Sequence, residues 1–367
     1  MPVPPSFPVP ADSIIHLIGI GGTGMSPLAT VLKQAGYTIT GSDLHRSPAV
    51  DALIELGVPI AIGHAPANVT GASLVIRSSA VPDSNAEVRQ ALHLGMRVLK
   101  HAEFLGLLSR TRRTLAVAGT HGKTTTTAML ATILLAAELD PTVLVGGVMP
   151  LLGSGARLGS SQFLVVEADE FDRRFLELRP EIAIVTNVEA DHLDYFGDLP
   201  AIEQAFREFL APVPDQGWVV AGADDPVAAA LAVERPSNAV TFGLSALAEW
   251  RAVGISRNEL GGNDFYVQAH GTLVGHFHLP VPGLHNVYDA LAAIVAAGRV
   301  GVDFTVAAAA LESFATVERR LERKGGVANI VVYDDYAHNP TKIRASLAAL
   351  REQHEGRIIC LYQPHTY

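Results

Sequence analysis

The chain has 367 residues, which is enough for roughly two or three domains. It carries 27 basic and 37 acidic side chains, a formal charge of −10, and 49% of its residues are hydrophobic. This composition excludes long disordered stretches, and the negative charge disfavours nucleic acid and anionic membrane surfaces as partners. An anionic substrate must therefore be held locally, by loop amides, single cations or metal ions.

The longest apolar runs lie near residues 128–137 and 291–297, and both are shorter than the ~20 residues that cross a bilayer. We therefore expect no membrane insertion. The proline-rich start, residues 1–13, has no basic side chain and lacks the apolar run of a signal peptide. Cys360 is the single cysteine, which suits a reducing compartment, so we expect a cytoplasmic protein.

Short β-branched runs alternate with longer Ala/Leu-rich runs, a pattern typical of α/β proteins with parallel sheets. A first unit, residues 14–108, is followed by a polar linker at 109–113. In this unit we predict a helix near 25–35 and strands at 14–18, 38–40, 74–77 and 97–99.

A glycine-rich segment, Gly19-Ile-Gly-Gly-Thr-Gly24, follows the first strand and opens the first helix. Asp43 lies about 20 residues further on, at the end of the second strand. Loop amides and a helix N-terminus can hold a pyrophosphate, and the Asp43 carboxylate can accept hydrogen bonds from ribose hydroxyls. Because NAD and a UDP-sugar both present a pyrophosphate, a nicotinamide oxidoreductase stays open, as does a merely structural turn.

A second unit, residues 112–316, opens with a strand at 115–118 and the loop Gly119-Thr-His-Gly-Lys-Thr-Thr125. This loop is similar to a P-loop, in which Lys123 reaches the β- and γ-phosphates and Thr124 binds Mg²⁺. It departs from the standard pattern at Val117, where a glycine is usual. The alternative is a Gly/Thr-rich helix cap.

Acidic residues follow two further apolar strands. The strand at 163–166 ends in Glu167, in the position of a carboxylate that holds nucleotide-bound Mg²⁺. The strand at 182–186 leads into a polar cluster that includes His192, a candidate metal ligand or carboxylate partner. An ordinary acidic loop and a merely hydrogen-bonding histidine are the alternatives.

The remaining predicted elements are strands at 142–145 and 218–221, antiparallel strands within 240–279, and a helix at 286–297. A third unit, residues 317–367, contains a strand at 330–333, a helix at 341–352 and a strand at 357–362. One crossover cannot bury both faces of a parallel sheet, so this unit is expected to be incomplete.

Six ordered segments resemble the Mur ligase family across residues 14–367. They are AGTHGKTTTT at 118–127, VEADE at 166–170, TNVEADHLD at 186–194, GLHN at 283–286, Arg319-Arg320 with DDYAHNP at 334–340, and QPH at 363–365. The resemblance implies a three-domain α/β fold. Its parts would be a Rossmann-like UDP-binding domain, a central P-loop-type ATPase domain and a partial Rossmann-like C-terminal domain.

The resemblance also implies a reaction. The carboxylate of UDP-N-acetylmuramate would attack the γ-phosphate of ATP, and the amine of L-alanine would displace phosphate from the resulting acyl phosphate, with Mg²⁺ as cofactor. The opening IGIGGTGMS at 18–26 is similar to the alanine-adding type. No lysine lies between Lys123 and Lys324, so the carbamylated lysine of several later-acting members cannot form. We expect a monomer or weak homodimer.

By the same resemblance, the candidate site residues fall into four sets, some shared. Catalytic residues are Lys123, Glu167, His192, Arg320 and Asp335; metal ligands are Thr124, Glu167 and His192. ATP contacts are Gly119, Thr120, His121, Gly122, Lys123, Thr124, Thr125, His285, Asn286, Arg320 and Asp335. Contacts to the UDP-sugar are Gly21, Gly22, Thr23, Gly24, Asp43, Ser78 and Ser79.

Two departures from the family pattern bear on activity. Asp289 stands where members often carry Asn, and we expect it near the adenine or ribose. The family's third domain continues beyond Tyr367, so we expect this chain to bind UDP-N-acetylmuramate but to ligate poorly or not at all. The alternatives are a ligase that attaches a tripeptide to the same nucleotide and a non-catalytic UDP-sugar-binding fragment.

Overall fold

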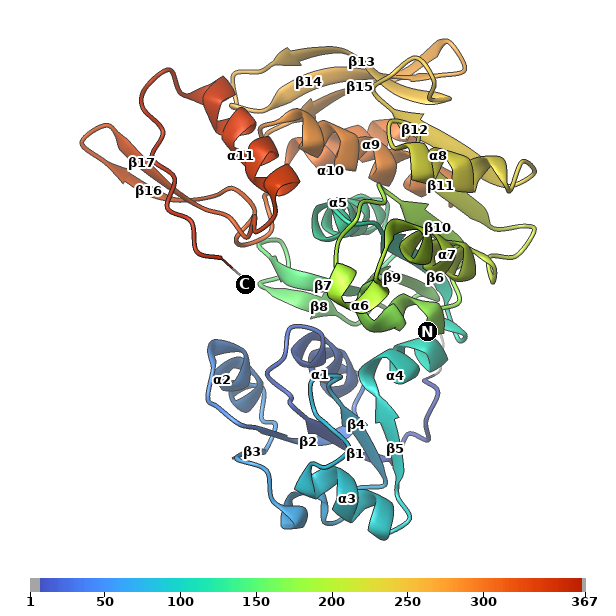
Figure 1. Cartoon of the computed structure of the whole chain (residues 1–367), viewed down its shortest axis with the longest axis vertical. Helices are drawn as coiled ribbons and strands as arrows, with labels where there is room; N and C mark the ends of the chain where they lie inside the picture. Colours follow the sequence, from blue (N-terminus) through green and yellow to red (C-terminus); the bar gives the residue numbers. More distant parts are fainter. Residues whose placement is uncertain (1–6, 365–367) are drawn as a thin grey trace.

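The computed structural model describes residues 7–364 and arranges them in three parts (Figure 1). A first domain is built on a five-stranded sheet, a central domain on a ten-stranded sheet, and a C-terminal region on a two-stranded hairpin. The segment 1–6 and His365 of the QPH segment lie outside the described residues. Within residues 7–364, no helix has the length and apolar character needed to cross a bilayer.

The first domain has an all-parallel sheet in the order β3-β2-β1-β4-β5. One face packs on α1 and α4 and the other on α3 and η1, and these layers form two apolar clusters. Its elements are β1 (Ile14–Ile18), α1 (Met25–Gln34), β2 (Thr38–Asp43), α2 (Pro48–Glu55), β3 (Ile60–Ile62), η1 (Pro66–Val69), β4 (Leu74–Arg77), α3 (Ala86–His93), β5 (Arg97–Lys100) and α4 (His101–Ser109).

The central sheet has the order β15-β14-β13-β12-β11-β10-β6-β9-β7-β8. Its middle is parallel, and the expected antiparallel strands form its far end as β13, β14 and β15. The strands are β6 (Arg113–Ala118), β7 (Thr142–Met149), β8 (Ser154–Arg157), β9 (Phe163–Glu167), β10 (Ile182–Val185), β11 (Trp218–Gly222), β12 (Ala239–Gly243), β13 (Trp250–Arg257), β14 (Asn263–Ala269) and β15 (Thr272–Leu279). Helix α4 ends at Ser109 and β6 begins at Arg113, so the observed connection spans residues 110–112, within the predicted linker at 109–113.

Helices cover both faces in the middle of this sheet, which is why β6, β9, β10 and β11 are buried at successive positions. On β6, Leu115 and Val117 join the cluster under α5 and α9, whereas Ala116 and Ala118 join the cluster on the opposite face. The helices are α5 (Lys123–Ala136), η2 (Phe171–Glu177), α6 (Leu193–Phe196), α7 (Leu199–Leu210), α8 (Pro226–Val233), α9 (Leu284–Arg299) and α10 (Phe304–Glu312).

The first and central domains meet through α4 and η2. Phe104 and Leu108 of α4 belong to the same apolar cluster as Phe175 of η2. A Cβ added at Gly106 would lie 2.6 Å from the carbonyl oxygen of Glu177, so the helix approaches the η2 backbone closely. The two domains therefore share one continuous apolar core at this contact.

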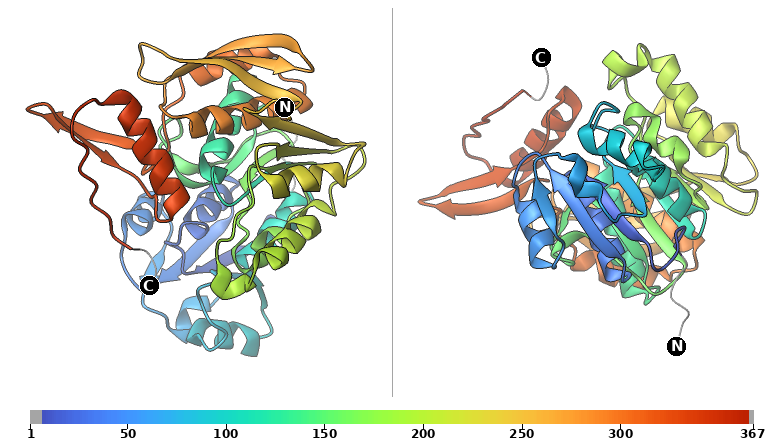
Figure 2. Two further views of the ribbon diagram at one scale, coloured as in Figure 1. Left: turned by 45° about the horizontal axis from the view of Figure 1, so that its top comes forward. Right: turned by 90° about the horizontal axis from the view of Figure 1, so that it is seen from below.

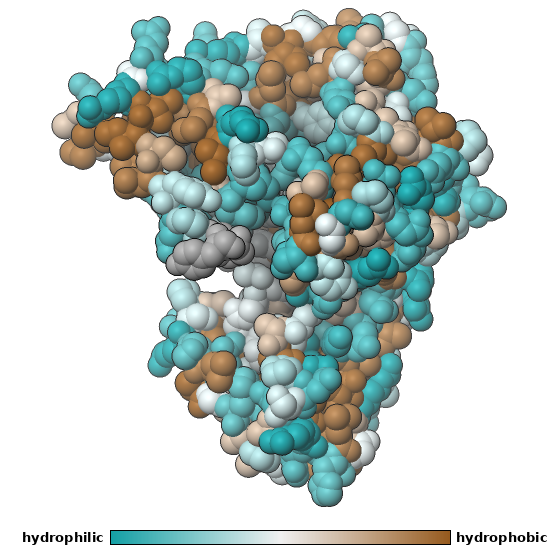
Figure 3. All heavy atoms as spheres, viewed as in Figure 1, coloured by the Kyte–Doolittle hydropathy of each residue, from teal (hydrophilic) through white to brown (hydrophobic). Residues whose placement is uncertain are grey.

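The C-terminal region stands to one side of the central sheet (Figure 2). It consists of β16 (Glu322–Val327), β17 (Ile330–Asp334), which pair antiparallel, and α11 (Pro340–Gln353). On the face shown in Figure 3, apolar side chains gather over this hairpin, where Val327 and Ile330 are exposed.

The predicted strand at 357–362 is wrong. The structure describes these residues as an irregular segment in which Leu361 is 95% exposed. A strand is stabilised by hydrogen bonds to a neighbouring strand, and this segment pairs with none among the described residues. The predicted strand at 330–333 and helix at 341–352 correspond to β17 and α11, but β17 pairs with an antiparallel strand that we did not predict.

Candidate nucleotide site

The second glycine loop lies between β6 and α5, at the carboxyl edge of the central sheet. Gly122 caps α5 with φ +80°, a left-handed conformation that suits glycine. The Lys123 ammonium donates to the carbonyl oxygen of Gly119 at 2.6 Å and to Glu170 at 2.9 Å. Burial opposes the charged form of Lys123, but Glu170 outweighs it and raises the lysine pKa. Lys123 is therefore a fixed cation beneath the loop.

Thr124, Glu167 and Arg320 meet directly beside Lys123. The Thr124 hydroxyl donates to Glu167 at 3.0 Å, and the Arg320 guanidinium donates to the same hydroxyl oxygen at 3.1 Å. The backbone amide of Gly146 fixes the second Glu167 oxygen at 2.9 Å. Hydroxyl and carboxylate oxygens are the ligands that Mg²⁺ prefers, so this pair fits the ion.

A polar network ties the loop to the strand end of β10. The His121 amide donates to the Asn187 side chain at 2.9 Å, and the His121 ring lies 3.0 Å from Glu189. Glu189 also accepts the Thr341 hydroxyl, from the first turn of α11, at 3.0 Å. The C-terminal region thus contacts the site directly. Asn187 and Glu189 were part of the predicted polar cluster, but we did not assign them to the site.

A cavity of about 430 Å³ opens over the loop. Its lining unites the predicted ATP contacts with unpredicted residues from the end of β11 and from α11. Of the predicted ATP contacts it includes Thr120, His121, Gly122, Lys123, Thr124, Thr125, His285, Asn286, Arg320 and Asp335, and it also includes the predicted metal ligand Glu167. Gly119 does not line this cavity, but its carbonyl oxygen accepts a hydrogen bond from Lys123. Asp335 accepts the backbone amides of Leu321 and Ala337, which orders the entry to the C-terminal region.

Asp289 lies against the glycine loop and lines the same cavity as His285 and Asn286. A Cβ added at Gly122 would lie 2.2 Å from an Asp289 carboxylate oxygen. The side chain is buried, and burial raises its pKa to about 8, against the opposing charge of Arg320. The carboxyl is therefore mostly protonated at neutral pH and adds little negative charge beside the loop.

His192 takes a different place from the other predicted metal ligands. It has φ +53° at the start of α6, and its ring lies 4.9 Å from the ring of Phe171. Its backbone amide donates to Asp191 at 2.9 Å. His192 lines neither of the two cavities beside the loops, whereas Thr124 and Glu167 line both.

The first glycine loop is ordered by a carboxylate at the end of β2. Asp43 accepts the backbone amide of Gly21 at 2.8 Å, so its oxygen orders the loop. The amide of Ser78 donates to the Ile18 carbonyl at 3.0 Å, which places Ser78 beside the loop at the same sheet edge. Gly22 follows in the same turn, donating to Gly19 at 3.1 Å, and Ser79 comes directly after Ser78.

A second cavity, of about 510 Å³, joins the two loops. Thr23 and Gly24 line it from the first domain, and Thr124, Glu167 and Arg320 line it from the nucleotide side. The end of the first loop and the start of α5, which follows the second loop, therefore open into one space.

Several residues of these cavities were not predicted from the sequence. His101 packs against Gly24, and burial with the nearby Arg174 lowers its pKa to about 4, so it is neutral. Lys342 lines the nucleotide cavity, where burial and the neighbouring Lys123 lower its pKa. Lys342 and Thr341 follow the DDYAHNP segment directly, and this proximity was the available signal for them.

Three family models match consecutive parts of the chain. The Mur ligase family, catalytic domain, matches residues 14–113; the Mur ligase middle domain matches 117–297; and the Mur ligase, glutamate ligase domain, matches 319–366. Both glycine loops lie within Mur ligase domains, so the alternative of a nicotinamide oxidoreductase is excluded.

The chain is 43% identical over 354 residues to UDP-N-acetylmuramate–L-alanine ligase of Caldanaerobacter subterraneus subsp. tengcongensis, covering 96% of this chain and 77% of the relative. The structure of UDP-N-acetylmuramate–alanine ligase from Thermotoga maritima matches with a TM-score of 0.83 at 32% identity, covering 94% and 79% of the two chains. UDP-N-acetylmuramate:L-alanyl-gamma-D-glutamyl-meso-diaminopimelate ligase from Neisseria meningitides matches with a TM-score of 0.77 at 33% identity, covering 84% and 100%.

Proposed function

Because the chain belongs to the Mur ligase family, we propose that it joins L-alanine to UDP-N-acetylmuramate in a reaction coupled to the cleavage of ATP to ADP and phosphate. The product is UDP-N-acetylmuramoyl-L-alanine, a precursor in peptidoglycan synthesis. The observation that carries this proposal is the cavity shared by Thr23 and Gly24 of the first loop and by Thr124 and Glu167 of the second. It gives a carboxylate extending from the first loop a path to a phosphate in the second.

The chemistry requires two anions to approach. A carboxylate oxygen of the substrate attacks the γ-phosphorus of ATP, and ADP leaves. Lys123 and Arg320 supply fixed positive charge where negative charge develops on the transferring phosphoryl group. The alanine amine then attacks the acyl carbon, loses a proton, and phosphate leaves. Closure of the site against water protects the acyl phosphate from hydrolysis.

We further propose that Thr124 and Glu167 hold Mg²⁺, which neutralises phosphate charge when bound. His192 is proposed to join a second ion, although its ring packs against Phe171 here. His285 and Asn286 at the start of α9, with Asp335, are proposed to contact the nucleoside side of ATP, since they line that cavity. Gly21, Asp43 and Ser78 are proposed to order the loop that holds the UDP-sugar.

Phosphate release tests the proposal. The purified chain is given ATP, Mg²⁺, UDP-N-acetylmuramate and a panel of amino acids together with the tripeptide L-alanyl-γ-D-glutamyl-diaminopimelate. L-Alanine should stimulate release most strongly. Lys123→Ala should lower the rate by about 10²–10³-fold or more, because it removes a charge that stabilises the transition state. Lys33→Ala, a lysine on α1 outside both cavities, should leave the rate unchanged.

The tripeptide ligase is the second candidate, because the Neisseria meningitides structure covers 84% of this chain. Stimulation by the tripeptide and not by L-alanine would support that activity and overturn ours. Binding of UDP-N-acetylmuramate without any amino-acid-stimulated phosphate release would instead indicate a non-catalytic fragment.

Two further properties belong to the same proposal. ATP and a UDP-sugar are nucleotides of the cytoplasm, so we propose that the protein works there. We also propose a monomer or weak homodimer, which sedimentation of the purified chain tests directly.

A further inference from the structure

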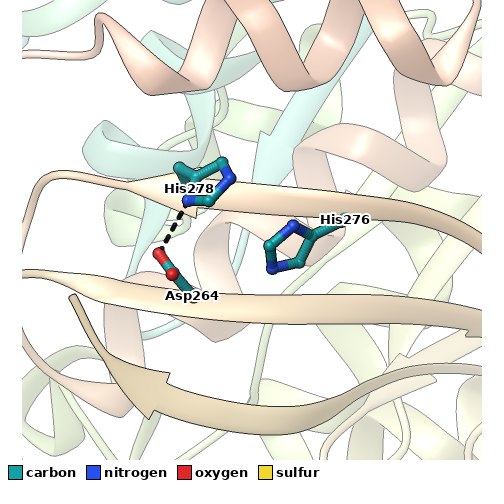
Figure 4. A group of neighbouring side chains, drawn as sticks. All are labelled: Asp264, His276 and His278. Atoms are coloured by element: carbon teal, nitrogen blue, oxygen red, sulfur yellow. Dashed lines mark hydrogen bonds and ion pairs between the residues drawn. The ribbon is translucent and has the colours of Figure 1, made fainter.

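A group of three metal-ligating side chains lies far along the central sheet, on β14 and β15. Figure 4 shows His276 and His278 on one strand and Asp264 on the neighbouring strand. One ligand atom of each lies within 4.8 Å of the others. None of the three lines the cavities beside the glycine loops. The group is therefore separate from the proposed nucleotide site.

Strand geometry explains how these residues share a face. His276 and His278 are two positions apart on β15, so their side chains point to the same side of the sheet. In the antiparallel register, Asp264 lies directly opposite His278, and Tyr266 lies opposite His276. The intervening Phe277 is fully buried on the other side. The three ligating side chains therefore project toward solvent.

Neighbouring residues already orient two of the ligands. Nδ1 of His278 lies 3.0 Å from Asp264 Oδ1, and the Asn258 amide donates to the same oxygen at 2.9 Å. The Tyr266 ring stacks on the His276 ring with 4.4 Å between centroids. Asn258 therefore fixes the direction of Asp264 before an ion arrives, whereas an ion would replace the Asp264–His278 hydrogen bond.

The geometry points to a surface site for a divalent transition metal of the Zn²⁺ class, held by Asp264, His276 and His278. Two imidazole nitrogens and one carboxylate oxygen suit Zn²⁺, Ni²⁺ or Cu²⁺, whereas Mg²⁺ and Ca²⁺ prefer oxygen ligands alone. Bonds of about 2.0–2.1 Å in a tetrahedron place ligand atoms about 3.3 Å apart. The His276 ring, which is exposed, needs to move by about 1.5 Å at most. Water completes the coordination.

The ion would link β14 to β15, the edge strand of the ten-stranded sheet. Asn258 connects this position to the turn that follows β13, because its side-chain oxygen accepts the amides of Leu260 and Gly262. The carbonyl of Gly261 in that turn accepts the Gln353 side chain of α11 at 2.5 Å. Occupancy therefore stiffens the part of the sheet that contacts the end of α11.

Calorimetric titration with ZnCl₂ tests the site. The protein is prepared without a polyhistidine tag, freed of metal with EDTA, and kept in excess MgCl₂ so that oxygen-rich sites are occupied. The wild type should bind one more Zn²⁺ than the His276→Ala/His278→Ala variant. His276→Ala, His278→Ala and Asp264→Asn should each weaken that site by about 10-fold or more. Equal stoichiometry and affinity in the wild type and the double variant would overturn the proposal.

His270→Asn is the matched control. His270 is exposed at the β14–β15 turn with φ +46°, a conformation that asparagine also adopts, and it lies outside the three-ligand group. It should keep the full zinc stoichiometry. Saturating Zn²⁺ should raise the melting temperature of the wild type and of this control by about 2 °C or more, and leave that of the double variant unchanged.

Imidazole NMR of the wild type makes the test independent of how the variants fold. The chain has 14 histidines, and Zn²⁺ should shift the resonances of His276 and His278 together, at one equivalent. Zinc-induced shifts confined to other histidines would contradict the proposal.

Discussion

The two glycine loops begin alike and are completed differently. Each follows the first strand of its domain and leads into a helix, α1 or α5, without a side-chain cap. The first loop is ordered through its backbone, because the amide of Gly21 donates a hydrogen bond to the Asp43 carboxylate. Around the second loop, Lys123 pairs with Glu170. The first loop is suited to hold a ligand by backbone amides, and the second to stabilise charge that changes during a reaction.

The second loop leads into a helix that contacts residues far away in the sequence, whereas the contact that orders the first loop is closer in sequence. Thr124 contacts Glu167 at the end of β9 and Arg320 from the C-terminal region, 196 positions away. Asp43 lies only 22 positions from Gly21. Substitutions at the second loop should therefore affect catalysis more strongly than substitutions at the first.

The largest effect among the following variants is expected for Glu167→Gln. Removing the charge weakens the oxygen pair proposed to hold Mg²⁺, so kcat/KM should fall by about 10²-fold and the Mg²⁺ concentration for half-maximal rate should rise. A magnesium titration of phosphate release measures both. Asp172→Asn in η2 should match the wild type, and an unchanged Mg²⁺ requirement in Glu167→Gln would rule out the proposed ligand.

A smaller effect is expected for Gly21→Ala in the first loop. The added Cβ would lie 2.7 Å from a Val50 methyl group and 3.1 Å from the Asp43 oxygen that holds the loop. The KM for UDP-N-acetylmuramate should rise by about 10-fold while kcat and the KM for ATP stay close to wild type. Steady-state kinetics with each substrate varied in turn measures this.

Gly36→Asn provides the comparison for that variant, because Gly36 has φ +90° and open space around it in the same domain. Its kinetic constants should not change. If Gly21→Ala raised the KM for ATP instead, the separation of the two loops by ligand would be incorrect.

The smallest effect on catalysis, and a distinct effect on stability, is expected for Asp289→Asn. Burial raises the pKa of Asp289 to about 8 in the folded protein, far above that of an exposed aspartate. Between about pH 4 and 8 the unfolded chain releases a proton that the folded protein keeps. The free energy of unfolding of the wild type should therefore fall as pH rises through this window.

The Asp289→Asn variant lacks this titration and should be more stable than the wild type by about 1–3 kcal/mol at pH 8 but similar near pH 4. Urea unfolding at a series of pH values measures the difference. Parallel pH profiles for the two proteins would show that the carboxyl does not titrate as the structure indicates.

Local sequence patterns predicted most strands and helices, because apolar runs and glycine loops mark them directly. They also placed Lys123, Thr124 and Glu167 together, since carboxyl ends of neighbouring parallel strands meet at one sheet edge. Confirmed elements include β1 and β10, whose predicted bounds differ from the observed ones by at most one residue.

Contacts between distant segments were beyond local patterns. Asp289 lies on α9 and faces Gly122, a packing relation that no spacing near either residue encodes. His101, at the start of α4, lies against Gly24, which is 77 positions earlier in the chain. The segment 357–362 has the composition of a strand, yet strand formation depends on a partner, which its own sequence does not specify.

The contact between α4 and η2 sets which parts of the molecule can rotate. Ser109 accepts the backbone amide of Arg179 at 3.0 Å beside the packed Phe104 and Phe175 rings, so tilting the first domain would uncover apolar surface to water. Among the described residues of the C-terminal region, from 317 to 364, the buried apolar side chains are Val317, Leu321 and Ala349. A tilt of the C-terminal region would therefore uncover less apolar surface than a tilt of the first domain, and Arg320, which touches Thr124, belongs to that region.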